Sequence, residues 1–157
     1  MKKQSVLFVC LGNICRSPAA EAIFIDLIKK KGLNNNFIVD SAGTGSWHIG
    51  KKADIRMRIA AQKRGVEILS KARQINANDF ERFNYIIAMD DANFKNISDL
   101  KYRKSLSDFS IINKIQNFRS VFEETAVPDP YFGGDEGFDH VLDILEDSVS
   151  GFLDTIC

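Results

Sequence analysis

The sequence predicts one α/β domain over residues 1–157, with a parallel β-sheet that carries helices on both faces. A length of 157 residues fits a single domain. Short apolar stretches rich in β-branched and aromatic residues alternate with stretches of helical periodicity. Such alternation is typical of βαβ units, whose sheets bind ligands at the carboxyl ends of the strands, beside the switch in strand order. The loop after the first strand is therefore the first candidate for a functional site.

The elements of the first half follow from apolar patterns and from residues that start or stop helices. Residues 4–10 (QSVLFVC) form a short apolar run that suits a buried strand. Ser17 and Pro18 suit the start of a helix, and Gly32 suits its end. The further elements expected here are a strand over residues 37–42 and a basic helix over residues 55–64, ended by Gly65.

The second half predicts one more buried strand and a long C-terminal helix. The strand is expected over residues 85–89 (YIIAM), after a short helix over residues 78–83, and Asp91 is expected to cap the helix that follows. The stretch 102–127 is the least regular, and we expect a short strand and a helix there. One apolar stripe marks the last helix as amphipathic; its members are Phe138, Val141, Leu142, Leu145, Val149, Phe152 and Ile156.

Composition argues against several classes of protein. No apolar run approaches the roughly 18 residues of a membrane span, and the apolar stretch after Lys2 and Lys3 is too short for a signal peptide. Three cysteines are not a disulfide framework, and no cysteine–histidine cluster has the spacing of a zinc site. We therefore expect a cytoplasmic protein with no cofactor, monomeric or weakly self-associating, although secretion without a signal peptide stays open.

The charges are segregated along the chain, although the formal net charge is zero. Residues 1–75 contain 14 Lys and Arg against 5 Asp and Glu, whereas residues 76–157 contain 7 against 16. One interpretation is a solvated acidic face, and the other is a basic half that attracts an anionic substrate. No dense basic stripe with interleaved aromatic residues is present, so we expect no nucleic-acid binding.

The segment CLGNICRS, which joins the first strand to the first helix, has the composition of an oxyanion site. Gly12 and Asn13 tolerate positive φ, so that consecutive backbone N–H groups can turn inward as an anion nest. The N-terminus of the following helix adds its dipole. Arg16 can hold two oxygens of a phosphate group with its planar fork.

The same donors would stabilise a thiolate at Cys10, which could then attack phosphorus directly. Ser17 could donate a further hydrogen bond to that thiolate. The alternative is that Cys10 merely ends a strand while Ser17 caps a helix. The glycine, the arginine spacing and the helix start coincide here, and their coincidence favours the catalytic interpretation.

A phosphate ester also needs a proton donor for its leaving group. The segment VPDPYFGG offers Asp129, which stands between two prolines that stiffen the backbone and fix the direction of the carboxyl group. Tyr131 and Phe132 follow, and we expect them to bury it. Alone, the segment could be an acidic turn with two surface aromatic residues. Beside a cysteine loop for phosphate, it predicts a general acid.

The segments CLGNICRSP and VPDPYFGG together resemble the low-molecular-weight protein tyrosine phosphatases. The resemblance runs over nearly the whole chain and includes DSAGT at residues 40–44, the loop around Trp47, KARQI at residues 71–75 and YIIAMD at residues 85–90. It implies a flavodoxin-like sheet of four parallel strands. It also implies an enzyme that hydrolyses phosphotyrosine in protein substrates through a cysteinyl-phosphate intermediate.

The resemblance assigns roles to individual residues. Cys10 is implied as the nucleophile, Arg16 as the phosphate clamp, and Asp129 as the acid and then the base for water. Cys15 matches a loop cysteine that can pair with Cys10 under oxidation. The implied phosphate-binding residues are Leu11, Gly12, Asn13, Ile14, Cys15, Arg16 and Ser17; the supporting residues are Asn13, Ser17, Ser41 and Asp90; and the walls of the substrate pocket are Ile14, Trp47, Tyr131 and Phe132.

Three alternative functions share the cysteine segment. A phosphoarginine phosphatase is expected to have threonine in place of Ile14, whose alkyl group cannot hydrogen-bond the guanidinium side of its substrate. A thiol-dependent arsenate reductase needs a relay of further cysteines, and none lies between Cys15 and Cys157. A phosphate-binding or phosphotyrosine-binding module would need no acid such as Asp129.

Overall fold

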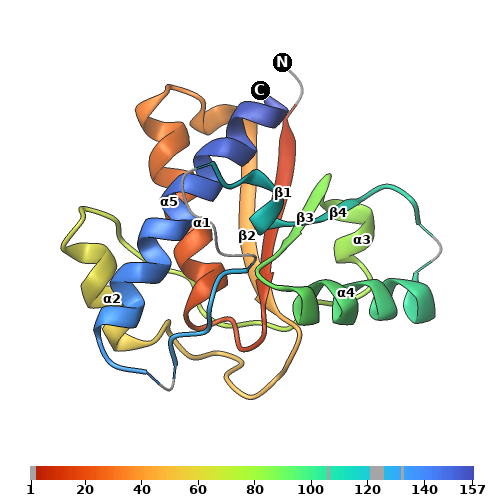
Figure 1. Cartoon of the computed structure of the whole chain (residues 1–157). Helices are drawn as coiled ribbons and strands as arrows, with labels where there is room; N and C mark the ends of the chain where they lie inside the picture. Colours follow the sequence, from red (N-terminus) through yellow and green to blue (C-terminus); the bar gives the residue numbers. More distant parts are fainter. Residues whose placement is uncertain (1–2, 106, 121–125, 132) are drawn as a thin grey trace.

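A four-stranded parallel β-sheet forms the centre of the molecule (Figure 1). The computed structural model describes residues 3–105, 107–120, 126–131 and 133–157. The strands stand in the order β2-β1-β3-β4, which confirms the predicted α/β fold with four parallel strands. Their bounds are β1 (Gln4–Cys10), β2 (Phe37–Gly43), β3 (Tyr85–Ala88) and β4 (Ile111–Lys114).

Helices cover both faces of this sheet. Figure 1 shows α1, α2 and α5 on one side of it and α3 and α4 on the other. Within the described ranges, no helix is long and apolar enough to cross a membrane. The helices are α1 (Arg16–Lys30), α2 (Ile55–Gln62), α3 (Asp79–Arg82), α4 (Asp91–Lys104), α5 (Glu136–Ile156), and the 3₁₀ helices η1 (Asn34–Asn36) and η2 (Ile115–Phe118).

The central strand β1 is apolar from Val6 to Cys10, and both of its faces are covered. Successive side chains of a strand point to opposite faces. Phe8 belongs to one core, where its ring lies 5.8 Å from that of Phe24 on α1 and 6.2 Å from that of Phe152 on α5. Leu7 belongs to the other core, together with Ile97 of α4. A strand buried in this way shows a continuous apolar run in place of an alternating one.

The helix after β3 is capped by Asp90, and the prediction of Asp91 as its cap is wrong. Asp90 has an extended backbone, with φ −153° and ψ 176°, and its side chain accepts the backbone N–H of Asn93 at 2.7 Å. This is the geometry of an N-cap. Two neighbouring aspartates suit the pattern equally well, and only the backbone conformation distinguishes them.

In the described part of the stretch 102–127, helix α4 extends as far as Lys104 and β4 supplies the expected strand. The helix described after β4 is the 3₁₀ turn η2. Residues 106 and 121–125 lie outside the described residues.

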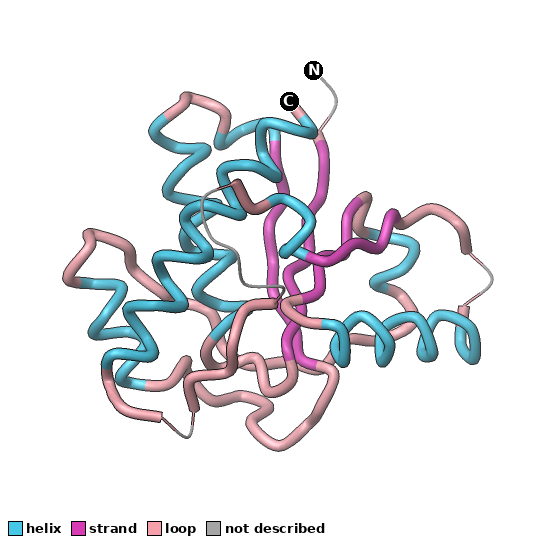
Figure 2. Tube along the Cα trace, viewed as in Figure 1, coloured by secondary structure: helices cyan, strands magenta, loops and turns pink. Residues whose placement is uncertain are grey.

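The candidate site lies where the strand order reverses. From β1 the chain moves first to β2 on one side and later to β3 on the other, so the switch lies beside the end of β1. Cys10 at the end of β1 pairs with Gly43 at the end of β2. Figure 2 shows loops gathered at this end of the sheet.

Candidate active site

The cysteine loop, residues 10–17, surrounds the sulfur of Cys10 with hydrogen-bonding groups. Cys10 is 2% exposed. Its Sγ accepts the backbone N–H of Asn13 at 3.3 Å and lies 3.0 Å from Oγ of Ser17. Ser17 lies in the first turn of α1, where free backbone N–H groups and the helix dipole favour negative charge. These groups together can stabilise a thiolate at Cys10.

Asn13 holds the cysteine loop in its curved shape. Its φ is 58°, in the left-handed region that asparagine tolerates better than most residues. Its side-chain amide donates to Oγ of Ser17 at 2.8 Å and to Oγ of Ser41 at 3.0 Å. Its Oδ1 accepts the backbone N–H of Arg73 at 2.9 Å, and Ser41 in turn donates to Glu21 at 2.7 Å. The loop is therefore tied to β2, to α1 and to the segment around Arg73.

Gly12 matters to the loop because it has no side chain, and not because of its backbone conformation. Of the two loop residues that tolerate positive φ, Asn13 adopts it and Gly12 does not. A Cβ atom at this position would come within 3.1 Å of Cδ2 of His48. Glycine therefore lets the His48 ring lie against the cysteine loop.

Arg16 is a buried guanidinium group held by oxygen atoms from two other segments. Its Nη1 donates to Asp90 at 2.5 Å and to the carbonyl of Val127 at 3.2 Å, and its Nη2 lies 3.6 Å from the carboxylate of Asp129. Burial alone would lower the pKa of Arg16, but Cys10 and the two carboxylates raise this pKa overall. The guanidinium therefore stays charged, and its contacts fix the direction of its fork.

Asp129 reaches the site from the aspartate loop, which comprises the described residues 126–131, 133 and 134. Its Oδ1 accepts the backbone N–H of Tyr131 at 3.1 Å, and its Oδ2 is the atom that faces Arg16. The side chain is 40% exposed, so the expected burial of this carboxyl group is wrong. Phe132, expected as a pocket wall, lies outside the described residues.

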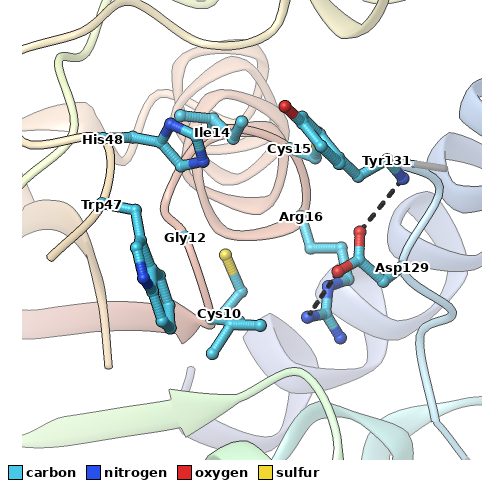
Figure 3. Close-up of a pocket in the computed structure, with 10 residues that line it drawn as sticks. Cys10, Gly12, Ile14, Cys15, Arg16, Trp47, His48, Asp129 and Tyr131 are labelled. Atoms are coloured by element: carbon cyan, nitrogen blue, oxygen red, sulfur yellow. Dashed lines mark hydrogen bonds and ion pairs between the residues drawn. The ribbon is translucent and has the colours of Figure 1, made fainter. Parts of the chain in front are cut away.

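One cavity of about 230 Å³ opens over the cysteine loop and brings most of the predicted residues together. Figure 3 shows Trp47 and Tyr131 on opposite sides of it, with the sulfur of Cys10 and the guanidinium of Arg16 between them. Trp47 is 67% exposed and presents its ring at the opening. The lining residues are Cys10, Leu11, Gly12, Ile14, Cys15, Arg16, Trp47, His48, Asp129 and Tyr131. Asn13, Ser17, Ser41 and Asp90 stand behind this lining and hold it.

Cys15 lines the same cavity but differs from Cys10 in its surroundings. Burial raises the pKa of the Cys15 thiol, and the negative charge of Asp54 raises it further. Cys15 therefore remains a protonated thiol at neutral pH. Both loop cysteines are free and buried, whereas Cys157 is free and exposed.

Three residues near the cavity were missed by sequence reasoning. His48 lines it, next in sequence to the predicted Trp47. Asp54 caps α2 and its backbone N–H donates to the carbonyl of Ile14 in the cysteine loop at 2.8 Å. Arg56 donates to the aspartate loop. The aspartate just before the helix expected at residue 55 was a readable cap signal, but its contact with the cysteine loop has no local signal.

The described residues contain no group of three or more His, Cys, Asp or Glu placed to hold a metal ion. The sulfur of Cys10, the guanidinium of Arg16 and the carboxyl group of Asp129 face one cavity with aromatic walls.

Comparison with known proteins gives consistent results over nearly the full length. The sequence profile described as "Low molecular weight phosphotyrosine protein phosphatase" matches residues 5–157. A protein of that name from Schizosaccharomyces pombe is 40% identical over 156 residues, which cover 99% of this chain and 98% of the relative.

Solved structures show the same similarity. A protein tyrosine phosphatase from Entamoeba histolytica superposes with a TM-score of 0.92 at 42% identity, covering 98% of this chain and 97% of the other. An arginine phosphatase from Drosophila superposes with a TM-score of 0.91 at 34% identity, covering 99% of this chain and 98% of the other.

Proposed function

We propose a mechanism and a substrate class for this chain, which belongs to the low molecular weight phosphotyrosine protein phosphatase family. The family membership and the phosphatase class predicted from the sequence are thereby confirmed. The proposed reaction is the hydrolysis of phosphotyrosine monoesters in protein substrates. The observation that carries the proposal is the convergence of Cys10, Arg16 and Asp129 on one cavity.

Cys10 is the proposed nucleophile. Its thiolate attacks phosphorus, so that an S–P bond forms while the P–O bond to the leaving group breaks. The N–H of Asn13 and the hydroxyl of Ser17 are placed to stabilise the thiolate. Arg16 binds two oxygens of the transferring phosphoryl group, because its planar fork matches their spacing. The charge that develops on those oxygens is thereby stabilised.

Asp129 is the proposed general acid and base. It donates its proton to the oxygen of the leaving phenolate as the P–O bond breaks. The resulting carboxylate then accepts a proton from water, which attacks the cysteinyl phosphate, releases inorganic phosphate and restores the thiolate. The carboxyl group stands at the rim of the cavity, 3.6 Å from Arg16, which is where a leaving group would depart.

The walls of the cavity favour a flat aromatic substrate. Trp47 and Tyr131 face each other across the opening, and the alkyl side chain of Ile14 lines it. A phenyl ring fits between such walls through apolar and ring contacts. The similarity to an arginine phosphatase makes phosphoarginine the second candidate, but Ile14 offers no hydrogen bond to a guanidinium group.

A substrate panel tests the proposal. We expect peptides with phosphotyrosine to be hydrolysed far faster than matched peptides with phosphoserine or phosphoarginine, and the Asp129→Ala variant to retain bound phosphotyrosine peptide. Asp129→Ala should lose more activity on phenyl phosphate than on p-nitrophenyl phosphate, because the nitrophenolate needs the proton less. General acids typically contribute about 10²–10⁴-fold. Faster hydrolysis of phosphoarginine, or equal losses on the two aryl phosphates, would contradict the assignment.

A further inference from the structure

Arg56 lies outside the cavity yet connects α2 to the aspartate loop. Its Nη2 donates to the carbonyl of Tyr131 at 2.8 Å, and its Nη1 donates to the carbonyl of Gly133 at 3.3 Å. The guanidinium also stands over two rings, 4.6 Å from the centre of Phe138 and 5.7 Å from that of Tyr131. One side chain thus holds two main-chain oxygens and one aromatic wall.

The guanidinium of Arg56 is itself fixed from the other side. The carboxylate of Asp54 accepts from its Nε at 3.1 Å and from its Nη2 at 3.0 Å. The side-chain hydrogen bonding between the two residues raises the pKa of Arg56 and lowers the pKa of Asp54. The backbone N–H of Asp54 donates to Ile14 in the cysteine loop at 2.8 Å. A continuous set of contacts therefore runs from the cysteine loop through α2 to the aspartate loop.

The contacts of Tyr131 explain why Arg56 matters for Asp129. The N–H of Tyr131 donates to Oδ1 of Asp129, while the carbonyl of Tyr131 accepts from Arg56. The hydrogen bond to Arg56 therefore restrains the residue whose N–H orients the carboxyl group. The other end of the loop is fixed separately, because Val127 donates to Met89 at 3.0 Å.

We propose that Arg56 is a positioning residue that sets the direction of the Asp129 carboxyl group by holding the Tyr131 and Gly133 carbonyls. The proposal rests on the proposed role of Asp129 as the acid. Arg56 is not among the residues that line the cavity, so its effect on catalysis passes through the aspartate loop. Two parallel N–H donors need an arginine, and lysine offers a single point charge.

The test measures kcat/KM for phenyl phosphate and p-nitrophenyl phosphate in the full chain. Arg56→Met should lose about tenfold or more on phenyl phosphate, since small misplacements of catalytic groups cost up to about a hundredfold, and clearly less on p-nitrophenyl phosphate. Arg56→Lys should recover part of the loss. Both substrates carry a phenyl ring, so a disturbed Tyr131 wall would affect them alike. Arg58→Met is the matched control, because Arg58 lies on the same helix and donates to Ala53.

A double variant separates positioning from general destabilisation. In the Asp129→Ala background, Arg56→Met should cost no further activity, because groups that act as one unit are not additive. Inhibition by inorganic phosphate should stay unchanged in Arg56→Met, which also reports an intact cysteine loop. Equal losses on both substrates, or the same loss with and without Asp129, would overturn the positioning role. Failure of the acid assignment itself would show separately, as an Asp129→Ala variant without leaving-group dependence, and it would overturn the positioning role as well.

Discussion

Replacement of Asp90 should weaken the fold and the anion site together. Its carboxylate accepts from buried Arg16 and also caps α4 through Asn93. Loss of an N-cap costs about 1 kcal/mol, and loss of a hydrogen bond to a charged group costs about 2 kcal/mol. Asp90→Ala should therefore lower the free energy of unfolding by about 3 kcal/mol. Asparagine is an equally good cap, so Asp90→Asn should lose only about 2 kcal/mol.

Thermal unfolding and phosphate inhibition are the two assays for Asp90. In a chain of this size, about 3 kcal/mol corresponds to a fall of about 6–12 °C in Tm. Without Asp90 the fork of Arg16 loses its strongest anchor, so the inhibition constant of inorganic phosphate should rise about tenfold, or about 1.4 kcal/mol. An Asp90→Ala variant with an unchanged Tm and unchanged phosphate inhibition would refute the reasoning. If Asp90→Asn lost as much stability as Asp90→Ala, the part of the stability loss that we assign to helix capping would be wrong.

Four further predictions concern the cysteine loop and its support. Cys10→Ser should abolish turnover while phosphate or vanadate still binds, because a serine hydroxyl is a far weaker nucleophile than a thiolate. Activity within about tenfold of the parent would exclude a thiolate nucleophile. Arg16→Lys should lose far more activity than conservation of charge suggests, since a point charge cannot reproduce a bidentate fork. Steady-state kinetics test this, and a nearly active lysine variant would contradict it. Mild peroxide should inactivate the enzyme reversibly through a Cys10–Cys15 disulfide, detectable by mass spectrometry and absent in Cys15→Ala. Burial raises the pKa of Glu21 above its ordinary value, so its charged form is disfavoured in the folded state. The stability of the parent protein relative to Glu21→Gln should therefore be greatest below the ordinary carboxyl pKa and should fall as pH rises through the folded pKa. Stability curves of the two proteins that stay parallel from pH 4 to 8 would contradict this.

The elements that matched the prediction are those with strong local patterns. The predicted bounds of the first strand agree with β1, because a strand buried on both faces reads as one apolar run. In the cysteine loop, Asn13 has the positive φ that its residue type tolerates, whereas Gly12 does not and its missing side chain leaves room for His48. Composition alone cannot separate these two uses of glycine, since both depend on the absence of Cβ.

Contacts between distant segments were beyond prediction from local pattern. Arg56 and the carbonyl of Tyr131 are 75 residues apart, and Arg16 and the carbonyl of Val127 are 111 residues apart. Main-chain carbonyls are present at every residue, so nothing in the sequence marks the two that accept these bonds. The fold had to be known before the arginines could be given partners.

The two arginines share one structural device. Arg16 binds Asp90, which caps α4, and Arg56 binds Asp54, which caps α2. Each capping carboxylate accepts both from a backbone N–H at a helix N-terminus and from an arginine side chain, so that a helix fixed in the fold sets the direction of a guanidinium. Through these groups α4 and α2 hold opposite ends of the aspartate loop, which carries the proposed acid. Helix stability and the placement of the acid are therefore coupled, and losses of both should accompany each other when either capping carboxylate is removed.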